Sequence, residues 1–220
     1  MKQIDIVFED KNMMVLEKSS GVVTTKEGSH KNTVEDWLVK NFKWAVKLKR
    51  AGIVHRLDKG TSGLLLVAKT EDSLAYLKQQ FKKRLIYKEY WALVEGEVSF
   101  EGEMILPIGR SRYNFLRWAV SELGKRAWTT FELIEKIMIA RKKYSLVKIV
   151  LKTGRTHQIR VHFSYLGWPL VGDKLYGGKI DLLTRPYLHA KRVGLVGIDG
   201  VNFEFETDLS DDLKLVLESK

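Results

Sequence analysis

The chain has 220 residues, of which 45% are apolar, and this is enough to bury a hydrophobic core in one globular unit. It carries 38 Lys and Arg against 27 Asp and Glu, and the resulting charge of +11 is typical of a protein that binds a polyanion. It contains no cysteine, which excludes disulfides, thiolate catalysis, iron–sulfur clusters and thiolate-bound zinc in these residues.

On charge alone the polyanion is RNA, DNA or an acidic membrane surface, and a solvated lysine-rich surface without a partner also stays open. The longest apolar run, Leu64 to Ala68, is too short to cross a bilayer. Residues 1–10 are charged and lack the apolar core of a signal peptide. We therefore expect a cytoplasmic protein that does not bind membranes.

The amino-terminal part predicts two short strands and one helix. The strands are Ile4–Phe8 and Met13–Glu17, joined by a polar turn. Thr33 is placed to cap the helix, and Asp36 to complete a capping box. The basic segment 40–50 that follows the helix predicts a loop.

The middle of the chain predicts a helix followed by four strands. Thr70 precedes apolar residues at offsets of three and four, the pattern of an amphipathic helix. The strands are expected at Tyr87–Val94, Glu103–Ile108, Trp128–Ile134 and Tyr144–Leu151. Four successive strands without intervening helices favour an antiparallel or mixed sheet.

The carboxy-terminal part predicts a second set of elements. Thr156 is placed to cap a helix that ends at Gly167. A strand pair at Leu188–Val196 and Asn202–Glu206 then leads to a terminal helix capped near Ser210. These elements together predict an α+β domain with a mixed sheet.

The segment from His55 to Lys69 contains the strongest candidate for chemistry. Asp58 lies between Arg56 and Lys59 just before an apolar run, and nearby positive charge favours the ionised form of a carboxyl group. An ionised aspartate can act as a base or as a nucleophile. The alternative is a charged turn that precedes a buried strand.

Two further segments carry residues suited to binding. In Thr153–His162 a glycine precedes a capped helix, so backbone N–H groups are exposed, and Arg155 and Arg160 add donors for phosphate or carboxylate. An ordinary amphipathic basic helix explains the same pattern. In Lys88–Gly96 the strand includes Tyr90, which by itself is equally typical of a buried aromatic residue.

The three segments resemble the signature of the RluA-type pseudouridine synthases, enzymes that isomerise uridine in RNA. The agreement continues through Gly167–Gly177 and extends, in the same order, from about Gly21 to Ala190. It implies the pseudouridine synthase fold: residues 1–220 as a single catalytic α+β domain, with helices flanking a mixed, largely antiparallel central sheet. We expect no separate amino-terminal RNA-binding domain, which many relatives carry, within this length.

The resemblance also implies roles for individual residues. Asp58 is the expected essential catalytic residue, as a nucleophile at C1′ of the ribose or as a base that takes the C2′ proton. Tyr90 is expected against the target base, with its ring stacked and its hydroxyl available for proton transfer. Arg56 is expected to help fill the gap that the extruded base leaves. We expect Arg155 to pair with Asp58 and hold it ionised.

The remaining expectations concern partners. The isomerisation has no net redox change and takes no group from outside, so we expect neither a cofactor nor a metal. The basic end of the helix after Thr70 (Lys82, Lys83 and Arg84) and the segment 40–50 are predicted to contact phosphates, although a solvated face explains them as well. His55 is a further RNA-binding candidate, and Arg160 is expected on the helix surface or at a phosphate. We expect a monomer that acts on an rRNA or tRNA stem-loop.

Two other classes of function compete with the synthase hypothesis. A non-catalytic RNA-binding module fits the charge and the aromatic residues, but it leaves Asp58 among cations without a role. A metal-dependent hydrolase could use His55, Asp58, His157 and His162 as ligands. The two later histidines are five residues apart and so point to different faces of a helix, and no acidic cluster suits magnesium.

Overall fold

The computed structural model describes residues 4–26 and 31–219. These residues form two compact units. Unit 1 contains the described residues up to Tyr87 together with Ala190–Asp208, and unit 2 contains Lys88–His189 together with the described residues from Leu209 onward. The chain therefore leaves unit 1 once and returns to it before the terminal helix.

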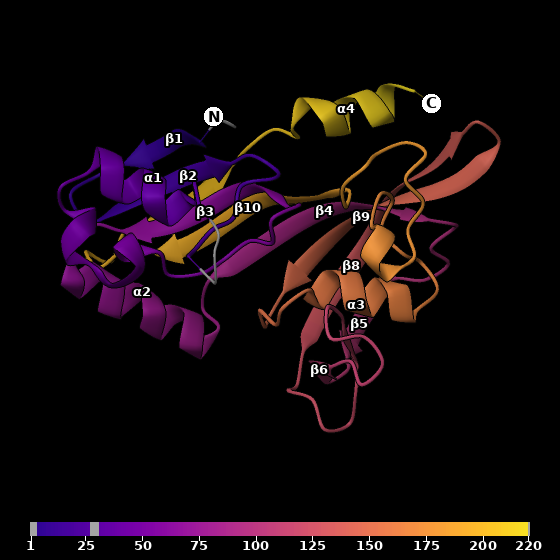
Figure 1. The fold of residues 1–220 in the computed structure, drawn as a ribbon, viewed down its shortest axis with the longest axis horizontal. Coiled ribbons are helices and arrows are strands. Elements are labelled where there is room, and N and C mark those ends of the chain that lie inside the picture. Colours follow the sequence, from indigo (N-terminus) through magenta and orange to yellow (C-terminus); the bar gives the residue numbers. More distant parts are fainter. Residues whose placement is uncertain (1–3, 27–30, 220) are drawn as a thin grey trace. The chain divides into compact units, whose positions relative to one another are not determined.

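Unit 1 is built on a sheet with two helices (Figure 1). The strand order is β1-β2-β3-β10, with β11 paired to β10. The β1–β2, β2–β3 and β10–β11 pairs are antiparallel. The strands are β1 (Ile4–Glu9), β2 (Met13–Lys18), β3 (Ser62–Ala68), β10 (Leu188–Val196, in this unit from Ala190) and β11 (Asn202–Glu206).

Local sequence determines where the helices of unit 1 begin. Helix α1 (Val34–Asn41) is capped by Thr33, whose side chain bonds reciprocally with Asp36 as predicted. Helix α2 (Glu71–Lys83) begins at Thr70 in the same way. Its apolar face packs on the sheet in one hydrophobic cluster with residues of β2, β3 and β10. The members of that cluster on α2 and the strands include Val15, Leu66, Leu74, Leu77 and Val193.

Glycine is required where two strands of unit 1 approach closely. Gly63 in β3 has φ +108°, and a Cβ at this position would lie 2.3 Å from the carbonyl oxygen of Ala190 in β10. Any other residue would force the two backbones apart. The strand that follows the Asp58 segment is therefore held close to β10.

Unit 2 contains a sheet in the order β4-β9-β8-β5, with all three pairs antiparallel, and a separate β6–β7 hairpin. The strands are β4 (Tyr87–Glu95), β5 (Gly102–Ile105), β6 (Ile108–Arg110), β7 (Trp118–Val120), β8 (Trp128–Ile139) and β9 (Lys142–Leu151). The helices are α3 (Gln158–Tyr165) and α4 (Asp211–Glu218). Figure 1 shows α3 in orange and α4 in yellow.

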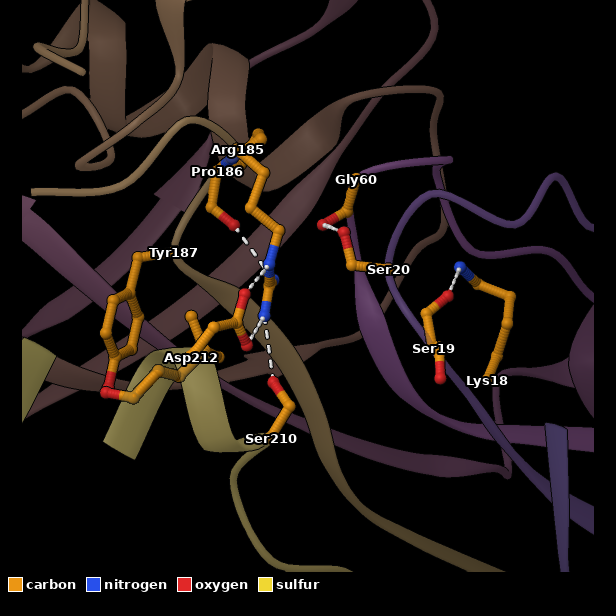
Figure 2. Close-up of polar contacts among 10 residues, drawn as sticks. Lys18, Ser19, Ser20, Gly60, Arg185, Pro186, Tyr187, Ser210 and Asp212 are labelled. Atoms are coloured by element: carbon orange, nitrogen blue, oxygen red, sulfur yellow. Dashed lines mark hydrogen bonds and ion pairs between the residues drawn. The ribbon is translucent and has the colours of Figure 1, made fainter. Parts of the chain in front are cut away.

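Helix α4 is fixed to unit 2 by apolar and polar contacts. Leu213 belongs to the buried cluster that includes Tyr187, and the Tyr187 hydroxyl donates to the Leu213 carbonyl at 3.0 Å. Arg185 donates to both carboxylate oxygens of Asp212 at 2.7 Å and to the Ser210 hydroxyl at 2.8 Å (Figure 2). The predicted terminal helix capped near Ser210 is confirmed, since Ser210 is its N-cap residue; the Ser210 hydroxyl accepts from Arg185 and makes no side-chain capping bond.

Four predicted elements are wrong in part. The expected strand Glu103–Ile108 is two strands, because Pro107 has no N–H to donate to a ladder. The expected loop 40–50 contains the end of α1 and two 3₁₀ turns, Ala45–Lys47 and Lys49–Gly52. Strands β8 and β9 run further than expected, up to the turn at Ala140 and Arg141.

Thr156 does not cap helix α3. The N-cap is His157, in a left-handed conformation with φ 56°. The Gln158 side chain takes the place of a cap, since its Oε1 accepts from the Arg155 N–H at 2.9 Å and from the Thr153 hydroxyl at 2.8 Å. The first turn is therefore organised by a residue inside the helix.

Candidate active site

The backbone next to Asp58 is held by the Thr24 side chain. The Thr24 hydroxyl accepts from the N–H of Leu57 at 3.2 Å and donates to the carbonyl of Leu57 at 2.8 Å. The carbonyl of Asp58 itself accepts from the Thr61 N–H at 3.0 Å. Asp58 is half-buried, so its position is defined by its neighbours while its side chain is partly accessible.

The residues after Asp58 are held by the loop of residues 18–25, which also carries Thr24. The Gly21 N–H donates to the Lys59 carbonyl at 2.6 Å, and Gly21 has φ +86°, a conformation that favours glycine. The Ser20 hydroxyl donates to the Gly60 carbonyl at 3.1 Å (Figure 2). The 18–25 loop therefore binds the backbone of residues 57–60 on both sides of Asp58.

His55 connects the Asp58 segment to the rest of unit 1. Its Nε2 accepts from the Leu66 N–H of β3 at 2.9 Å, and its ring stacks on Phe81 of α2 with centroids 4.9 Å apart. An accepting Nε2 requires that a neutral ring carries its proton on Nδ1. Arg56, the next residue, is exposed. The predicted RNA contacts of His55 and Arg56 stay predictions.

The basic candidates of unit 1 are accessible. Lys82, Lys83 and Arg84 are all exposed at the carboxy-terminal end of α2, where the helix dipole favours cations. The segment 40–50 presents exposed lysines, and its Phe42 packs between Trp37 and Trp44 with ring centroids 5.5 Å apart in both pairs. The aromatic residues there stabilise the segment itself.

Tyr90 lies in the middle of β4, opposite Ile149 of β9, and is 7% exposed. Lys88 is two residues earlier on the same strand and so points to the same side of it. Burial lowers the pKa of Lys88 to about 8. This side of β4 therefore holds a phenol and an amine that is easier to deprotonate than an ordinary lysine.

Arg155 is half-buried, whereas Arg160 is buried. The Nε of Arg155 donates to the carbonyl of Arg126 at 3.1 Å. Arg160 is only 8% exposed, and its Nε and Nη2 donate to the two carboxylate oxygens of Asp173 at 2.7 and 2.8 Å. The expected position of Arg160 on the helix surface is wrong, because its guanidinium is buried with this partner. Its RNA contact stays a prediction.

Sequence reasoning missed the residues around Arg160. Its guanidinium lies over the ring of Tyr176, 4.8 Å from the centroid. The Tyr176 hydroxyl accepts from the Trp118 N–H at 2.9 Å and lies 2.8 Å from Nδ1 of His157, within hydrogen-bond distance. No local pattern predicts this network, since its members come from β7, α3 and the 173–177 segment.

The 106–126 segment, which contains β6 and β7, was also missed as a functional surface. It has five basic side chains against one acidic, and its tip exposes Tyr113 (100%), Phe115 (80%) and Leu116 (74%). The tip is ordered by backbone bonds, including Ser111 N–H to Arg117 carbonyl at 3.0 Å. The alternation of arginine and aromatic residues in 110–118 was the available signal.

The metal-dependent hydrolase hypothesis requires several ligand side chains in one group. In residues 4–26 and 31–219 no group of three or more His, Asp or Glu is arranged to hold a metal ion. Both ring nitrogens of His162 contact protein atoms, Nδ1 at 2.9 Å from the Thr129 hydroxyl and Nε2 at 3.1 Å from the Leu106 carbonyl.

In residues 4–26 and 31–219, no helix is long and apolar enough to span a membrane.

Comparison with known proteins identifies the family. A family model described as RNA pseudouridylate synthase matches residues 12–165, more than half of the chain and a range that includes Asp58, Tyr90 and Arg155. The chain belongs to the RNA pseudouridylate synthase family. The predicted family is therefore confirmed.

Individual members of the RNA pseudouridylate synthase family agree with this result. The chain is 37% identical to "Ribosomal large subunit pseudouridine synthase D" of Zymomonas mobilis over 98% of this chain and 72% of that protein. It is 39% identical to "Uncharacterized RNA pseudouridine synthase YhcT" of Bacillus subtilis over 88% of this chain and 64% of that protein. The solved structure of human RNA Pseudouridylate Synthase Domain Containing 1 superposes with a TM-score of 0.77 and 28% identity, covering 94% of this chain and 84% of that one.

Membership of the RNA pseudouridylate synthase family confirms three predictions. The fold is α+β, the chain is an isomerase that converts uridine to pseudouridine, and its partner is RNA. The matches give no support to a non-catalytic RNA-binding module.

Proposed function

We propose that the chain modifies uridine in RNA of the large ribosomal subunit and that Asp58 is its essential catalytic residue. The support for Asp58 is its half-buried position in a segment whose backbone is bonded on both sides, inside the range that matches the family. The support for the ribosomal substrate is the name of the relative in Zymomonas mobilis, "Ribosomal large subunit pseudouridine synthase D".

The reaction breaks the bond from N1 of uracil to C1′ and forms a bond from C5 to C1′. The Asp58 carboxylate assists either as a nucleophile at C1′ or as a base that takes the C2′ proton, and both routes return the carboxylate unchanged. After the base has turned, the C5 proton leaves and N1 gains a proton. Tyr90 stacks on the base and moves the proton from C5, and Arg155 is the proposed partner of the Asp58 carboxylate.

We propose that residues 1–220 act as one catalytic domain, as a monomer in the cytoplasm. No cofactor is needed, because the isomerisation gains and loses no atoms overall. Family resemblance and chemistry support this assignment of the two units to one reaction.

RNA binding is proposed to use separate positive surfaces on the two units. In unit 1 the surface is Arg56 together with the exposed end of α2, and Arg56 helps fill the gap left by the flipped base. In unit 2 it is the 106–126 segment, where Tyr113 and Phe115 stack on unpaired bases and the arginines contact phosphates. The overall charge of +11 suits an RNA partner.

The test is pseudouridine-specific chemical mapping of total RNA from cells with and without the gene. The deleted strain is complemented with the wild type, Asp58→Asn, or the control Asp72→Asn, which changes an exposed aspartate in the first turn of α2. We expect a site in large-subunit rRNA that is lost on deletion and restored by the wild type and the control, but not by Asp58→Asn. Restoration by Asp58→Asn would refute the role of Asp58, and a site in tRNA would refute the ribosomal substrate alone.

A further inference from the structure

Thr24 makes an unusual pair of bonds with the residue before Asp58. Its buried hydroxyl bonds to both backbone polar groups of Leu57, although the two residues are 33 positions apart in the chain. The hydroxyl hydrogen goes to the Leu57 carbonyl, and an oxygen lone pair receives the Leu57 N–H. The Thr24 side chain thus satisfies the N–H and the carbonyl of Leu57, as a neighbouring strand would do in a sheet.

The 18–25 loop that carries Thr24 is itself fixed. Lys18 is fully buried, and its Nζ donates to the carbonyls of Ser19 and Val22, both at 3.0 Å; Figure 2 draws the contact with Ser19. The N–H of Glu35 in α1 donates to the Thr24 carbonyl at 3.1 Å. Thr24 therefore connects the first turn of α1 to the Asp58 segment.

The bonds from Thr24 and its loop occupy the carbonyls of residues 57, 59 and 60, and the Thr61 N–H occupies that of Asp58. Asp58 has only two side-chain torsions, so the position of its carboxylate depends on the backbone at 57–60. Thr24 has a β-branched side chain with few rotamers, which fixes its hydroxyl in one place. A small shift at Leu57 would be carried directly to the carboxylate.

We propose that Thr24 is a positioning residue for catalysis, whose hydroxyl sets the backbone at Leu57 and thereby the place of the Asp58 carboxylate. This inference rests on the proposed role of Asp58. Reacting groups must meet in a narrow range of geometry, and a displacement of about 1 Å can lower a rate about hundredfold. Thr24 acts through Asp58 and is expected to affect the chemical step instead of RNA affinity.

The neighbouring Thr25 provides a matched control. It is also buried, at 4% exposure, and its hydroxyl has no hydrogen-bond partner among the residues that the structure describes. Thr24→Val and Thr25→Val make the same chemical change one position apart, and only the first removes bonds to Leu57. Thr24→Ser and Thr24→Ala form a second comparison, because these two variants differ only in the hydroxyl.

The experiment uses the full chain and an RNA oligonucleotide that contains the mapped uridine. Single-turnover rate, RNA Kd and Tm are measured for the wild type, the four threonine variants and Asp58→Asn. We expect Thr24→Val to lower the rate at least about tenfold with Kd within about twofold, and Thr24→Ser to be at least about fivefold faster than Thr24→Ala. Thr25→Val should match the wild type.

The outcomes test the positioning role of Thr24 separately from the catalytic role of Asp58. A folded Thr24→Val with a rate within twofold of the wild type refutes the positioning role, while an inactive Asp58→Asn in the same series leaves the proposed function standing. An active Asp58→Asn refutes the proposed function and the inference with it. If Thr24→Val does not fold, the serine and alanine variants decide, and equal rates for those two refute the positioning role.

Discussion

Arg160 and Asp173 form a buried two-point ion pair, with both carboxylate oxygens of Asp173 within 2.8 Å of the guanidinium. Removal of one partner leaves a buried charge without compensation. We expect Asp173→Ala to lower the free energy of unfolding by about 3–5 kcal/mol, measured by urea denaturation. The exposed pair Lys142–Asp181 is the control, and Asp181→Ala should leave unfolding unchanged within error. Equal effects of the two variants would contradict the buried pair.

The pH dependence of stability should include a contribution from His162. Burial lowers the pKa of His162 below its usual 6.5. Its Nε2 must carry the proton that goes to the Leu106 carbonyl, so in the neutral ring Nδ1 accepts from the Thr129 hydroxyl.

The sign of this effect follows from proton uptake. Above pH 6.5 the ring is neutral in both states, and below it the unfolded chain binds a proton that the folded chain does not. The free energy of unfolding of the wild type should therefore fall as the pH drops below 6.5. His162→Gln should show a smaller fall over the same range in urea titrations, and an equal fall would disprove the contribution of His162.

Tyr90→Phe should separate stacking from proton transfer. The ring is retained, so RNA affinity is expected to stay within about twofold of the wild type. Loss of the hydroxyl removes a general acid or base, and such a group is commonly worth at least about a hundredfold in rate. Single-turnover assays on the mapped oligonucleotide measure the rate, and an unchanged rate would leave Tyr90 with a packing or stacking role only.

The tip of the 106–126 segment should contribute to RNA affinity through stacking. Tyr113→Ala and Phe115→Ala are each expected to weaken RNA binding about tenfold, since a stacked base is worth about 1–3 kcal/mol. Both side chains are exposed, so Tm should not change. Tyr165→Ala, an exposed tyrosine on α3, is the control in a fluorescence binding assay. Equal Kd values for all three variants would argue against the stacking surface.

Salt dependence should reveal the phosphate contacts of α2. For single-stranded RNA the slope of log affinity against log salt is about 0.7 per phosphate neutralised. The double variant Lys82→Gln and Lys83→Gln should therefore reduce the slope by about 1.4. Lys136→Gln removes an exposed lysine on β8 and serves as the control. A slope that is unchanged in the double variant would place the RNA elsewhere.

Features determined by neighbouring residues were predictable from the sequence. The capping box of Thr33 and Asp36 is formed as expected, and the helix predicted after Thr70 begins with a second box to Ser73. The turn between β8 and β9 was missed, because Ala140 and Arg141 adopt φ of 46° and 63°. Such a turn usually contains Asn or Gly, so the sequence carried no signal for it.

Pairings between distant residues were not predictable. Arg160 was expected at the surface because a helical pattern does not reveal a carboxylate thirteen residues further along the chain. Likewise, nothing near Thr24 indicates that its hydroxyl binds Leu57. The role of Asp58 was predicted from its family motif, and the residues that hold its segment in place became visible only in the folded chain.

The Thr24–Leu57 contact makes local opening of the protein measurable at a single amide. The Leu57 N–H is protected from solvent by a side-chain hydroxyl across 33 residues of chain, so its hydrogen exchange reports separation of two segments and not fraying of a strand. A transient opening there would interrupt catalysis without unfolding either sheet. If this contact opens first on heating, thermal inactivation should begin before the cores melt.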